Sequence, residues 1–269
     1  MAKPFLKWAG GKTWFVTNEE TRLPHNYNRY IEPFLGGASV FFHLNPREAI
    51  LTDINRELIN TYIAVKEDFD KVYKYLREHE RKHCQEYYYR IRNMHPRTRP
   101  SAAARMIYLN KTCFNGVYRL NGNGDFNVPY GTDKQISFDR NELCDTSQAL
   151  QNATLYCQSF EETINLAQEN DFLFCDPPYV VPDETSRFVL YGLDSFTWND
   201  QLRLADLLHT ALERGVKIVL TNIEHPDIRA LYNDDPRFHL DTLMRKCTIS
   251  GTADGRGDFR ELVVSANIH

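Results

Sequence analysis

Four consecutive residues, Asp176, Pro177, Pro178 and Tyr179, have the types needed to hold an amino group beside an aromatic ring. They follow the apolar segment 172–175, which has the pattern of a buried strand, and α/β sheets bind ligands at the carboxyl ends of their strands. Because proline has no N–H, the Pro177 carbonyl is left as an acceptor beside the Asp176 carboxylate. Two such acceptors suit an amine with two N–H donors, and Tyr179 offers a face on which a base can stack. The spacing favours this site over a proline-rich turn with a capping aspartate.

A glycine-containing turn in the first part of the chain indicates a nucleoside site. The expected strand 30–34 runs into Gly36 and Gly37, which let the backbone turn tightly and let a ligand approach closely. Asp53 ends the next expected strand, 49–53, seventeen residues after Gly36. An acid at that place in a Rossmann-like sheet accepts hydrogen bonds from ribose hydroxyls. The pair predicts an adenosine-containing ligand and does not distinguish NAD from S-adenosylmethionine.

The N-terminal sequence from Leu6 to Thr13, Leu-Lys-Trp-Ala-Gly-Gly-Lys-Thr, imitates the end of a P-loop. A P-loop requires glycine at the position of Leu6, and no strand of convincing length precedes this segment. We therefore exclude a nucleoside-triphosphatase. Trp8 and Lys12, which stand beside two glycines, are candidates for lining a ligand site instead.

The apolar periodicity predicts an α/β domain interrupted by a helical insert. Short apolar segments alternating with helices predict a parallel sheet at both ends of the chain. A helical period starts near residue 57 and continues, with breaks at prolines, to residue 109. The turn sequence Asn-Gly-Asn-Gly at 121–124 predicts a hairpin or loop on this insert, whose length of roughly 80 residues suits a small domain. The expected strands are 30–34, 49–53, 155–157, 172–175, 216–220 and 262–265, and the expected helices beside them are 38–44 and 202–212.

Charge is distributed unevenly along the chain. The formal net charge is −4, which argues mildly against a nucleic-acid partner. Between Lys71 and Arg119, however, twelve Lys and Arg occur with three Glu and no Asp, which gives +9 and leaves −13 for the remainder. This segment is either a basic face for nucleic acid or a solvated, arginine-rich helical surface, and charge alone does not decide between them.

The size and the cysteines are those of an ordinary intracellular protein. The 269 residues are enough for one large domain, or for one domain with an insertion. No apolar run approaches the roughly 20 residues that span a bilayer, and the N-terminus lacks the apolar stretch of a signal peptide, so we expect a cytosolic protein without a membrane partner. The six cysteines are scattered without a Cys-x-x-Cys pair, so we expect no metal site and no disulfide framework.

Taken together, these motifs resemble the Dam family of DNA adenine-N6 methyltransferases, of the GATC-type D12 class. The resemblance covers nearly the whole chain and includes the order of the parts, with a recognition insert between a cofactor half and a catalytic half. The matching segments are Phe5–Lys12 for the N-terminal cofactor motif, Glu32–Gly37 for the glycine loop, Thr52–Asn55 for the acidic strand end, Asn115–Arg119 and Phe126–Gly131 for the recognition hairpin, and Asp176–Tyr179 for the catalytic motif.

The resemblance implies the Rossmann-like fold of S-adenosylmethionine-dependent methyltransferases, with an inserted, mainly helical DNA-recognition domain that bears a β-hairpin. It implies a catalytic domain split between residues 1–56 and 141–269, and a target-recognition domain at residues 57–140. The implied reaction moves a methyl group from S-adenosylmethionine to N6 of an adenine flipped out of double-stranded DNA and leaves S-adenosylhomocysteine. No metal and no obligatory protein partner are expected, and the expected location is the cytoplasm of a prokaryotic or phage-infected cell.

The resemblance also assigns candidate catalytic and cofactor roles. Asp176 and the carbonyl of Pro177 would hydrogen-bond the adenine amine, and Tyr179 would stack on the flipped base. Transfer would be direct and in line, because Cys175 would point to the other side of the strand and could not act as a nucleophile. For Phe160, a place in the core is an alternative. The candidate cofactor-binding residues are Trp8, Lys12, Phe34, Gly36, Asp53, Ile54, Phe160 and Asp176.

A third group of residues is assigned to DNA. In the family, an aromatic residue of the recognition hairpin wedges into the DNA stack, and Phe114 has that position here. Arg119 matches an arginine that reads guanine, and Lys7 matches a lysine implicated in reading the first guanine. Two members of the set, Val117 and Pro129, could instead shape the hairpin. The candidate DNA-binding residues are Lys7, Phe114, Asn115, Val117, Arg119 and Pro129.

The chain departs from the family pattern after Gly131. The family commonly continues Arg-Tyr-Lys, which contacts DNA, whereas this chain has Thr132, Asp133 and Lys134. A cation and an aromatic are lost and an acid is gained, so GATC is the favoured target, with altered specificity or weaker DNA affinity as alternatives. The glycine-rich stretch 249–257 resembles a mobile loop of the family near the DNA, or is a plain surface loop.

Two other classes of protein stay open on the sequence. One is a methyltransferase that acts on another amine, such as cytosine N4, RNA or a protein amide. The other is a catalytically weak DNA-binding relative. The intact Asp176 and Tyr179 argue against the second class, whereas Asp133 and the acidic net charge favour it.

Overall fold

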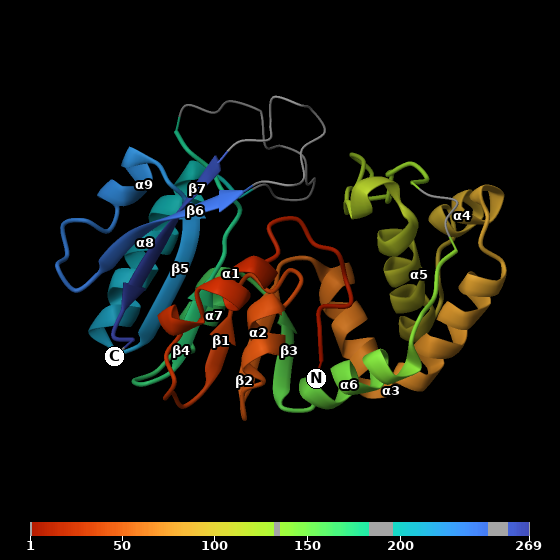
Figure 1. Cartoon of the computed structure of the whole chain (residues 1–269), viewed down its shortest axis with the longest axis horizontal. Helices are drawn as coiled ribbons and strands as arrows, with labels where there is room; N and C mark the ends of the chain where they lie inside the picture. The colour runs from red at the N-terminus through yellow and green to blue at the C-terminus, as the bar shows by residue number, and fades with distance from the viewer. Residues whose placement is uncertain (1, 132–134, 183–195, 247–257, 269) are drawn as a thin grey trace. The chain divides into compact units, whose positions relative to one another are not determined.

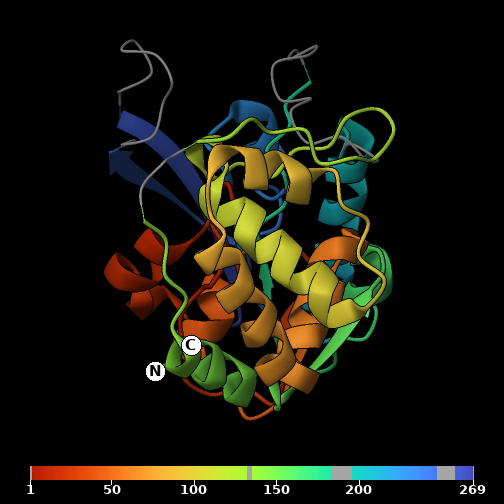
Figure 2. The same ribbon diagram turned by 90° about the vertical axis from the view of Figure 1, so that its right-hand side faces the viewer.

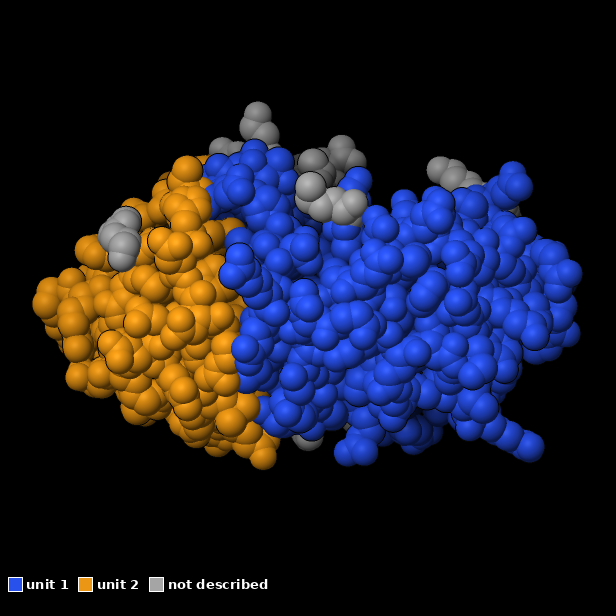
Figure 3. Space-filling model, turned by 90° about the horizontal axis from the view of Figure 1, so that it is seen from below, with its two compact units in different colours: residues 1–20, 35–159, 190–195 blue, residues 21–34, 160–189, 196–269 orange. Residues whose placement is uncertain are grey.

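The computed structural model describes residues 2–131, 135–182, 196–246 and 258–268 (Figure 1). The chain divides into two compact units, which Figure 3 colours separately. Unit 1 comprises residues 1–20, 35–159 and 190–195, and unit 2 comprises residues 21–34, 160–189 and 196–269. These units are defined by contacts, so the predicted division into a catalytic and a target-recognition domain stays a prediction.

Seven strands form one mixed sheet in the order β3-β2-β1-β4-β5-β7-β6. The pairs β2–β3, β1–β4 and β4–β5 are parallel, whereas β7 pairs antiparallel with both β5 and β6. The α/β class is confirmed. The strands are β1 Tyr30–Glu32, β2 Ala49–Asp53, β3 Ala153–Cys157, β4 Phe172–Cys175, β5 Lys217–Ile223, β6 His239–Lys246 and β7 Asp258–Ala266.

The predicted parallel pairing holds for β1 to β5 and does not extend to the edge formed by β7 and β6. The last predicted strand lies in β7, which is antiparallel to its neighbours, and β6 was not predicted at all. Strand β6 lies at the edge of the sheet, where one face is open to solvent, and polar residues such as Asp241 interrupt its apolar pattern. An edge strand of this kind lacks the continuous apolar run that identified β4, which is buried throughout.

Unit 1 combines the strands β2 and β3 with most of the helices. Strands β2 and β3 pair in parallel, from Ala49 opposite Ala153 to Asp53 opposite Cys157. The long helix α3 packs against α5 and α6, and α4 packs against α5. Figure 2 shows α3 in orange and α5 in yellow. The helices of this unit are α1 Thr13–Asn18, α2 Ser39–Leu44, α3 Arg56–Arg81, α4 Gln85–Arg92, α5 Arg99–Thr112 and α6 Arg140–Leu150, with a short 3-10 turn, η2, at Phe114–Gly116.

Helix α3 confirms the helical period that the sequence predicts from near residue 57. The Asn55 side chain accepts a hydrogen bond from the backbone N–H of Leu58 at 3.0 Å and caps the first turn. The buried face of α3 contains Ile59, Tyr62 and Val65, which are among the residues that show the helical period in the sequence. Because Asn55 is the second residue after Asp53, the cap fixes the end of β2 to the start of α3.

The segment after α5 forms the predicted hairpin, although it makes isolated bridges rather than continuous strands. Leu120 pairs antiparallel with Phe126, and Cys113 pairs antiparallel with Tyr130. The Asn121 side chain accepts hydrogen bonds from two backbone N–H groups in the turn, each at 2.9 Å. The hairpin therefore has a locally fixed turn.

Unit 2 contains β1, β4, β5, β7 and β6, with α8 packed on β5. A capping box at Thr197 and Asp200 begins α8, as expected for a helix in this α/β part. The remaining helices of the unit are α7 Phe160–Ile164, α8 Trp198–Glu213 and α9 Pro226–Ala230. In the part of the chain that the structure describes, no helix is both long enough and apolar enough to cross a membrane.

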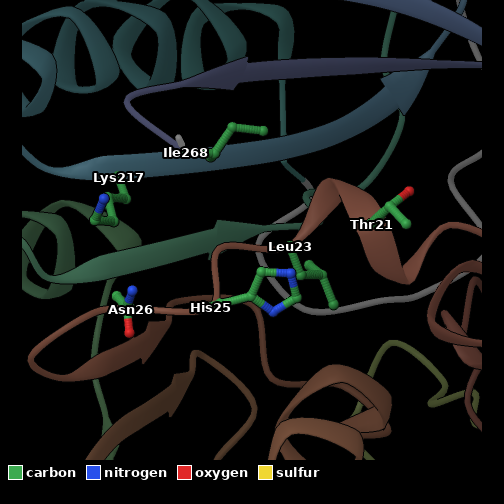
Figure 4. A pocket seen from close by; sticks show the side chains of 6 residues that line it. All are labelled: Thr21, Leu23, His25, Asn26, Lys217 and Ile268. Carbon is green, nitrogen blue, oxygen red and sulfur yellow. The ribbon is translucent and has the colours of Figure 1, made fainter.

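A small pocket of unit 2 lies away from the Asp176 motif (Figure 4). Lys217, which lines it, begins β5, whereas Asp176 follows the last residue of β4. Because β4 and β5 are parallel, these two places are at opposite ends of the strands. The pocket is lined by Thr21, Leu23, His25, Asn26, Lys217 and Ile268.

Candidate functional site

The Asp176 motif follows the carboxyl end of β4 in unit 2, as predicted. Thr221 of β5 donates a hydrogen bond from Oγ1 to Oδ1 of Asp176 at 2.9 Å. Tyr179 donates its phenolic hydrogen to Oε1 of Glu261, on β7, at 2.6 Å. Neighbouring strands thus hold both the carboxylate and the aromatic ring. Thr221 and Glu261 are part of the candidate site that the sequence motifs did not identify.

Burial controls the protonation of the groups beside the motif. Desolvation, with the negative charges of Asp176 and Glu261, holds the pKa of Tyr179 well above its usual value, so this hydroxyl remains a donor to Glu261. Burial likewise raises the pKa of the Cys175 thiol well above its usual value. A thiol that is fully buried and protonated is a poor nucleophile, which supports the expectation that Cys175 takes no part in transfer.

Three aromatic rings lie together elsewhere in unit 2. The rings of Phe34 and Phe160 stack with centroids 5.4 Å apart and an interplanar angle of 25°. Phe196 meets both of them, with centroids 5.8 Å from Phe34 and 5.7 Å from Phe160. Phe34 and Phe160 are partly exposed, which fits an apolar wall better than a closed core.

In unit 1, the structure joins the glycine turn to the acidic strand end. The Asp53 carboxylate accepts the backbone N–H of Gly36 at 3.1 Å and that of Asn55 at 2.9 Å. Burial raises the pKa of Asp53, and these backbone donors oppose that effect. Each carboxylate oxygen has two acceptor positions, so the group can accept further hydrogen bonds from a ligand. Ile54 beside it is 61% exposed.

Gly36 also places Trp8 against this turn. The backbone of Gly36 has a φ of +45°, and a Cβ atom at this residue would lie 2.8 Å from Cδ1 of Trp8. A side chain is thus disfavoured by both backbone conformation and space. The Trp8 ring stacks on Tyr118, with centroids 5.2 Å apart and an interplanar angle of 27°. Within unit 1, contacts therefore link Asp53, Gly36 and Trp8 to the hairpin that the sequence predicts to recognise DNA.

Lys12, the other candidate of the N-terminal motif, is buried rather than extended into solvent. It is 4% exposed, and its ammonium group donates to the carbonyl of Gly10 at 3.0 Å. A buried ammonium beside a backbone carbonyl is a strong donor that can meet a carboxylate or another acceptor.

Most of the candidate DNA-binding residues lie at the surface of unit 1. Phe114 is 54% exposed at the start of the turn η2, and Asn115 has a left-handed φ of +56°. Lys7 and Pro129 are exposed as well, while Val117 and Arg119 are partly exposed. The exposure of Phe114 is compatible with the predicted contact to a base stack, which stays a prediction.

Asn110, which the sequence motifs did not identify, attaches the N-terminal segment around Lys7 to this turn. Its buried amide accepts the N–H of Lys7 at 2.7 Å and donates to the carbonyls of Lys7 at 2.8 Å and Gly116 at 3.2 Å. The structure thus fixes the backbone of Lys7 beside the turn that carries Phe114. Nothing in the local sequence indicates this role, because an asparagine inside a helix gives no pattern of its own.

Two predictions fall outside the described residues. These are the departure from the family pattern at 132–134 and the glycine-rich stretch at 249–257. Among the described residues, no group of three or more His, Cys, Asp or Glu side chains is arranged to hold a metal ion.

Comparison with known proteins identifies the family. Residues 8–249 match the family described as D12 class N6 adenine-specific DNA methyltransferase. The chain belongs to this family and is an adenine-specific DNA methyltransferase, which confirms the resemblance found in the sequence. Membership implies S-adenosylmethionine as the methyl donor and DNA as the substrate.

Relatives from several prokaryotes resemble the chain over nearly its full length. The type II methyltransferase M1.LlaDCHI of Lactococcus lactis subsp. cremoris is 34% identical, covering 98% of this chain and 95% of the relative. The type II methyltransferase M.MjaIII of Methanocaldococcus jannaschii is 36% identical, covering 95% of this chain and 96% of the relative. The DNA adenine methylase of Escherichia coli K12 is 32% identical, covering 93% of this chain and 90% of the relative.

Proposed function

We propose that the chain methylates N6 of an adenine flipped out of double-stranded DNA, with GATC as the favoured target. The observation that carries this proposal is the Asp176 motif at the carboxyl end of β4, with Asp176 held by Thr221 and Tyr179 held by Glu261. Because the substrate is DNA and the compared relatives are prokaryotic, we expect the protein to act in the cytoplasm of a prokaryotic or phage-infected cell.

The residues around Asp53 fit an adenosine-containing cofactor. Its carboxylate has acceptor capacity for ribose hydroxyls, Gly36 leaves the space that a Cβ would fill, and the exposed Ile54 supplies an apolar surface for a base. When bound, S-adenosylmethionine supplies an electrophilic methyl group on sulfur and leaves as S-adenosylhomocysteine. We assign its binding to Trp8, Lys12, Phe34, Gly36, Asp53, Ile54, Phe160 and Asp176.

In this proposal the Asp176 motif orients the amine. The Asp176 carboxylate and the Pro177 carbonyl accept the two N–H groups of the adenine amine, so that its lone pair points at the methyl group. The same negative charge stabilises the positive charge that develops on nitrogen during transfer. Tyr179 stacks on the flipped base, and its hydrogen bond to Glu261 holds the ring in place. This stacking offsets part of the few kcal/mol that flipping the base costs.

We assign target recognition to the insert of residues 57–140, and catalysis to residues 1–56 and 141–269, which would form a Rossmann-like methyltransferase fold. In this division, the exposed Phe114 wedges into the base stack, and Asn115 follows it on the turn. Lys7 and Arg119 read guanines in the major groove, with Val117 and Pro129 as apolar contacts.

Methyl transfer from labelled S-adenosylmethionine tests the proposal. Purified full-length protein is incubated with a GATC duplex, with the same duplex in which GATC is scrambled, with single-stranded DNA and with RNA. The expected result is N6-methyladenine in the GATC duplex. Label in cytosine, RNA or protein alone would refute the adenine assignment. Label in adenine of the scrambled duplex at an equal rate would refute GATC, and cofactor binding without transfer to any DNA would support a catalytically weak DNA-binding protein.

A further inference from the structure

Arg119 is held by a side chain on the opposite arm of the hairpin. Its guanidinium Nε donates a hydrogen bond to Oδ1 of Asn127 at 2.8 Å. The backbone N–H of Asn127 donates in turn to the carbonyl of Arg119 at 3.1 Å. The bridge between Leu120 and Phe126 makes these two residues direct cross-strand neighbours. The contact between the side chains is therefore set by the register of the hairpin.

The hairpin beneath this pair is anchored on both sides. At the turn, Asn121 accepts two backbone N–H groups, which fixes the register. At the other side of Arg119, Tyr118 donates to Oε2 of Glu57 at 2.6 Å and stacks on Trp8. A side chain on so constrained a backbone loses less freedom when it binds than a free arginine would.

The hydrogen bond from Nε of Arg119 to Asn127 determines which edge of the guanidinium is available to a base. Among the described residues, neither terminal nitrogen of Arg119 makes a hydrogen bond, an ion pair or a ring contact. An arginine reads guanine by two parallel donors to O6 and N7. With Nε bonded to Asn127, the two terminal nitrogens form the pair that remains for this contact.

We propose that Asn127 is a positioning residue for target specificity, which fixes the guanidinium of Arg119 so that its terminal nitrogens read one guanine. This inference rests on the proposed role of Arg119 in reading a base. It assigns to Asn127 an effect on base discrimination, and not on overall DNA affinity. Phosphate contacts fix the protein on DNA without carrying sequence information, so the two effects can be separated.

The test measures kcat/KM on a set of duplexes in which every base near the methylated adenine is varied one position at a time. The variants are Asn127→Ala, Arg119→Ala, the double variant and Asn127→Asp, which retains an acceptor oxygen. Asn123→Ala, in the turn of the same hairpin, serves as the matched control. Thermal melting of each variant shows that it is folded.

Arg119→Ala is expected to lose discrimination at one guanine by about 10- to 100-fold, the range for a bidentate contact. Asn127→Ala is expected to lose roughly 3- to 10-fold in discrimination at the same guanine and little at other positions, because it weakens the bidentate contact without removing it. The double variant should match Arg119→Ala, because Asn127 acts through the arginine. Asn127→Asp should keep the discrimination at a lower overall rate, and Asn123→Ala should behave as wild type.

A uniform loss of rate on all sequences in Asn127→Ala, with discrimination intact, would overturn the inference and indicate a phosphate contact. Additive losses in the double variant, or no effect of Arg119→Ala on any guanine, would overturn it as well. If the wild type methylates adenine in a sequence other than GATC, the proposed target fails, and the same comparison at the guanines of that sequence still decides the role of Asn127.

Discussion

At the scale of single residues, the candidate catalytic group is a carboxylate whose position depends on neighbouring strands. Asp176 follows β4, and Thr221 of β5 donates to it. The types of residue in the motif indicate the chemistry, because an acceptor carboxylate, an acceptor carbonyl and an aromatic face suit the amine of a base. The partners that hold them come from β5 and β7, which are distant in sequence.

Replacing Asp176 by asparagine tests this chemistry with little change in volume. Asp176→Asn puts a neutral amide where negative charge should stabilise the developing positive charge, so kcat is expected to fall by about 10²–10³ or more. Single-turnover transfer and DNA binding are measured in parallel. Unchanged kcat would contradict the assigned role, and loss of DNA binding with intact chemistry would place Asp176 elsewhere in the cycle.

A glycine should be required at position 36, in the turn that contacts Asp53 and Trp8. Gly36→Ala introduces a Cβ at a positive φ and 2.8 Å from Trp8, so we expect a loss of about 1–3 kcal/mol in unfolding free energy and weaker cofactor binding. Gly124→Ala is the matched control, because Gly124 has a φ of +82° and open space around its Cα. Gly124→Ala should lose only the part of the unfolding free energy that comes from placing a side chain at a positive φ, and it should keep its cofactor affinity. Urea unfolding measures the stability, and calorimetry measures the affinity. Equal effects at both glycines would contradict the contact with Trp8.

At the scale of elements, the recognition hairpin is tied to the start of α3. Tyr118 donates to Glu57 at 2.6 Å, and Arg105 of α5 donates to the other oxygen of Glu57 at 3.2 Å. Glu57 is in the first turn of α3, only four residues after Asp53. The helix that starts at the candidate cofactor site thus also supports the segment that carries Arg119.

Tyr118→Phe should weaken this support without removing the ring that stacks on Trp8. The loss of a hydrogen bond to a charged group is expected to lower the unfolding free energy by about 1.5–3 kcal/mol. Tyr118→Leu removes the stack as well and should lower cofactor affinity further. Urea unfolding and cofactor titration separate the two variants. A Tyr118→Phe protein as stable as wild type would show that the bond to Glu57 contributes nothing.

His79 makes the packing of α3, α4 and α5 sensitive to acid. It is 5% exposed, its Nδ1 lies 2.7 Å from the Tyr87 hydroxyl, and its ring packs on Tyr108. Burial lowers the pKa of His79 from 6.5 to about 4. Because the unfolded chain binds the proton more tightly, stability is full above pH 6.5 and falls as pH drops towards 4, by about 3 kcal/mol at most.

Urea unfolding between pH 4 and 7 measures this effect. The fall in stability should be smaller in His79→Gln than in the wild type, because the group that titrates has been removed. The same slope in His79→Gln and wild type would show that other groups cause the acid sensitivity.

At the scale of the whole molecule, the chain combines an acidic total charge with a basic segment. The net charge is −4, while the segment from Lys71 to Arg119 carries +9. DNA binding by such a segment releases counterions, so log Kd for a duplex should rise linearly with log salt, with a slope of about 0.9 per neutralised phosphate. Fluorescence anisotropy at salt concentrations from about 50 to about 200 mM measures this slope. Binding that is independent of salt would show that the basic segment does not contact DNA.

The sequence by itself determined the family, the chemistry and the class of fold. Asp176 to Tyr179, Gly36 and Asp53 could be identified as candidate site residues because each depends on residue type and on short spacing along the chain. The helix α3 and the buried strand β4 were predictable for a similar reason, since periodicity and apolar runs are local properties.

The tertiary structure alone decided which side chains support these residues. Thr221, Glu261, Asn110 and Asn127 form hydrogen bonds with partners that only the fold brings near, and an isolated threonine, glutamate or asparagine carries no local signal of such a contact. The antiparallel edge at β6 was missed because a half-exposed strand has no continuous apolar run. Local patterns encode burial and backbone preference, whereas hydrogen-bond partners depend on distances that exist only after the chain has folded.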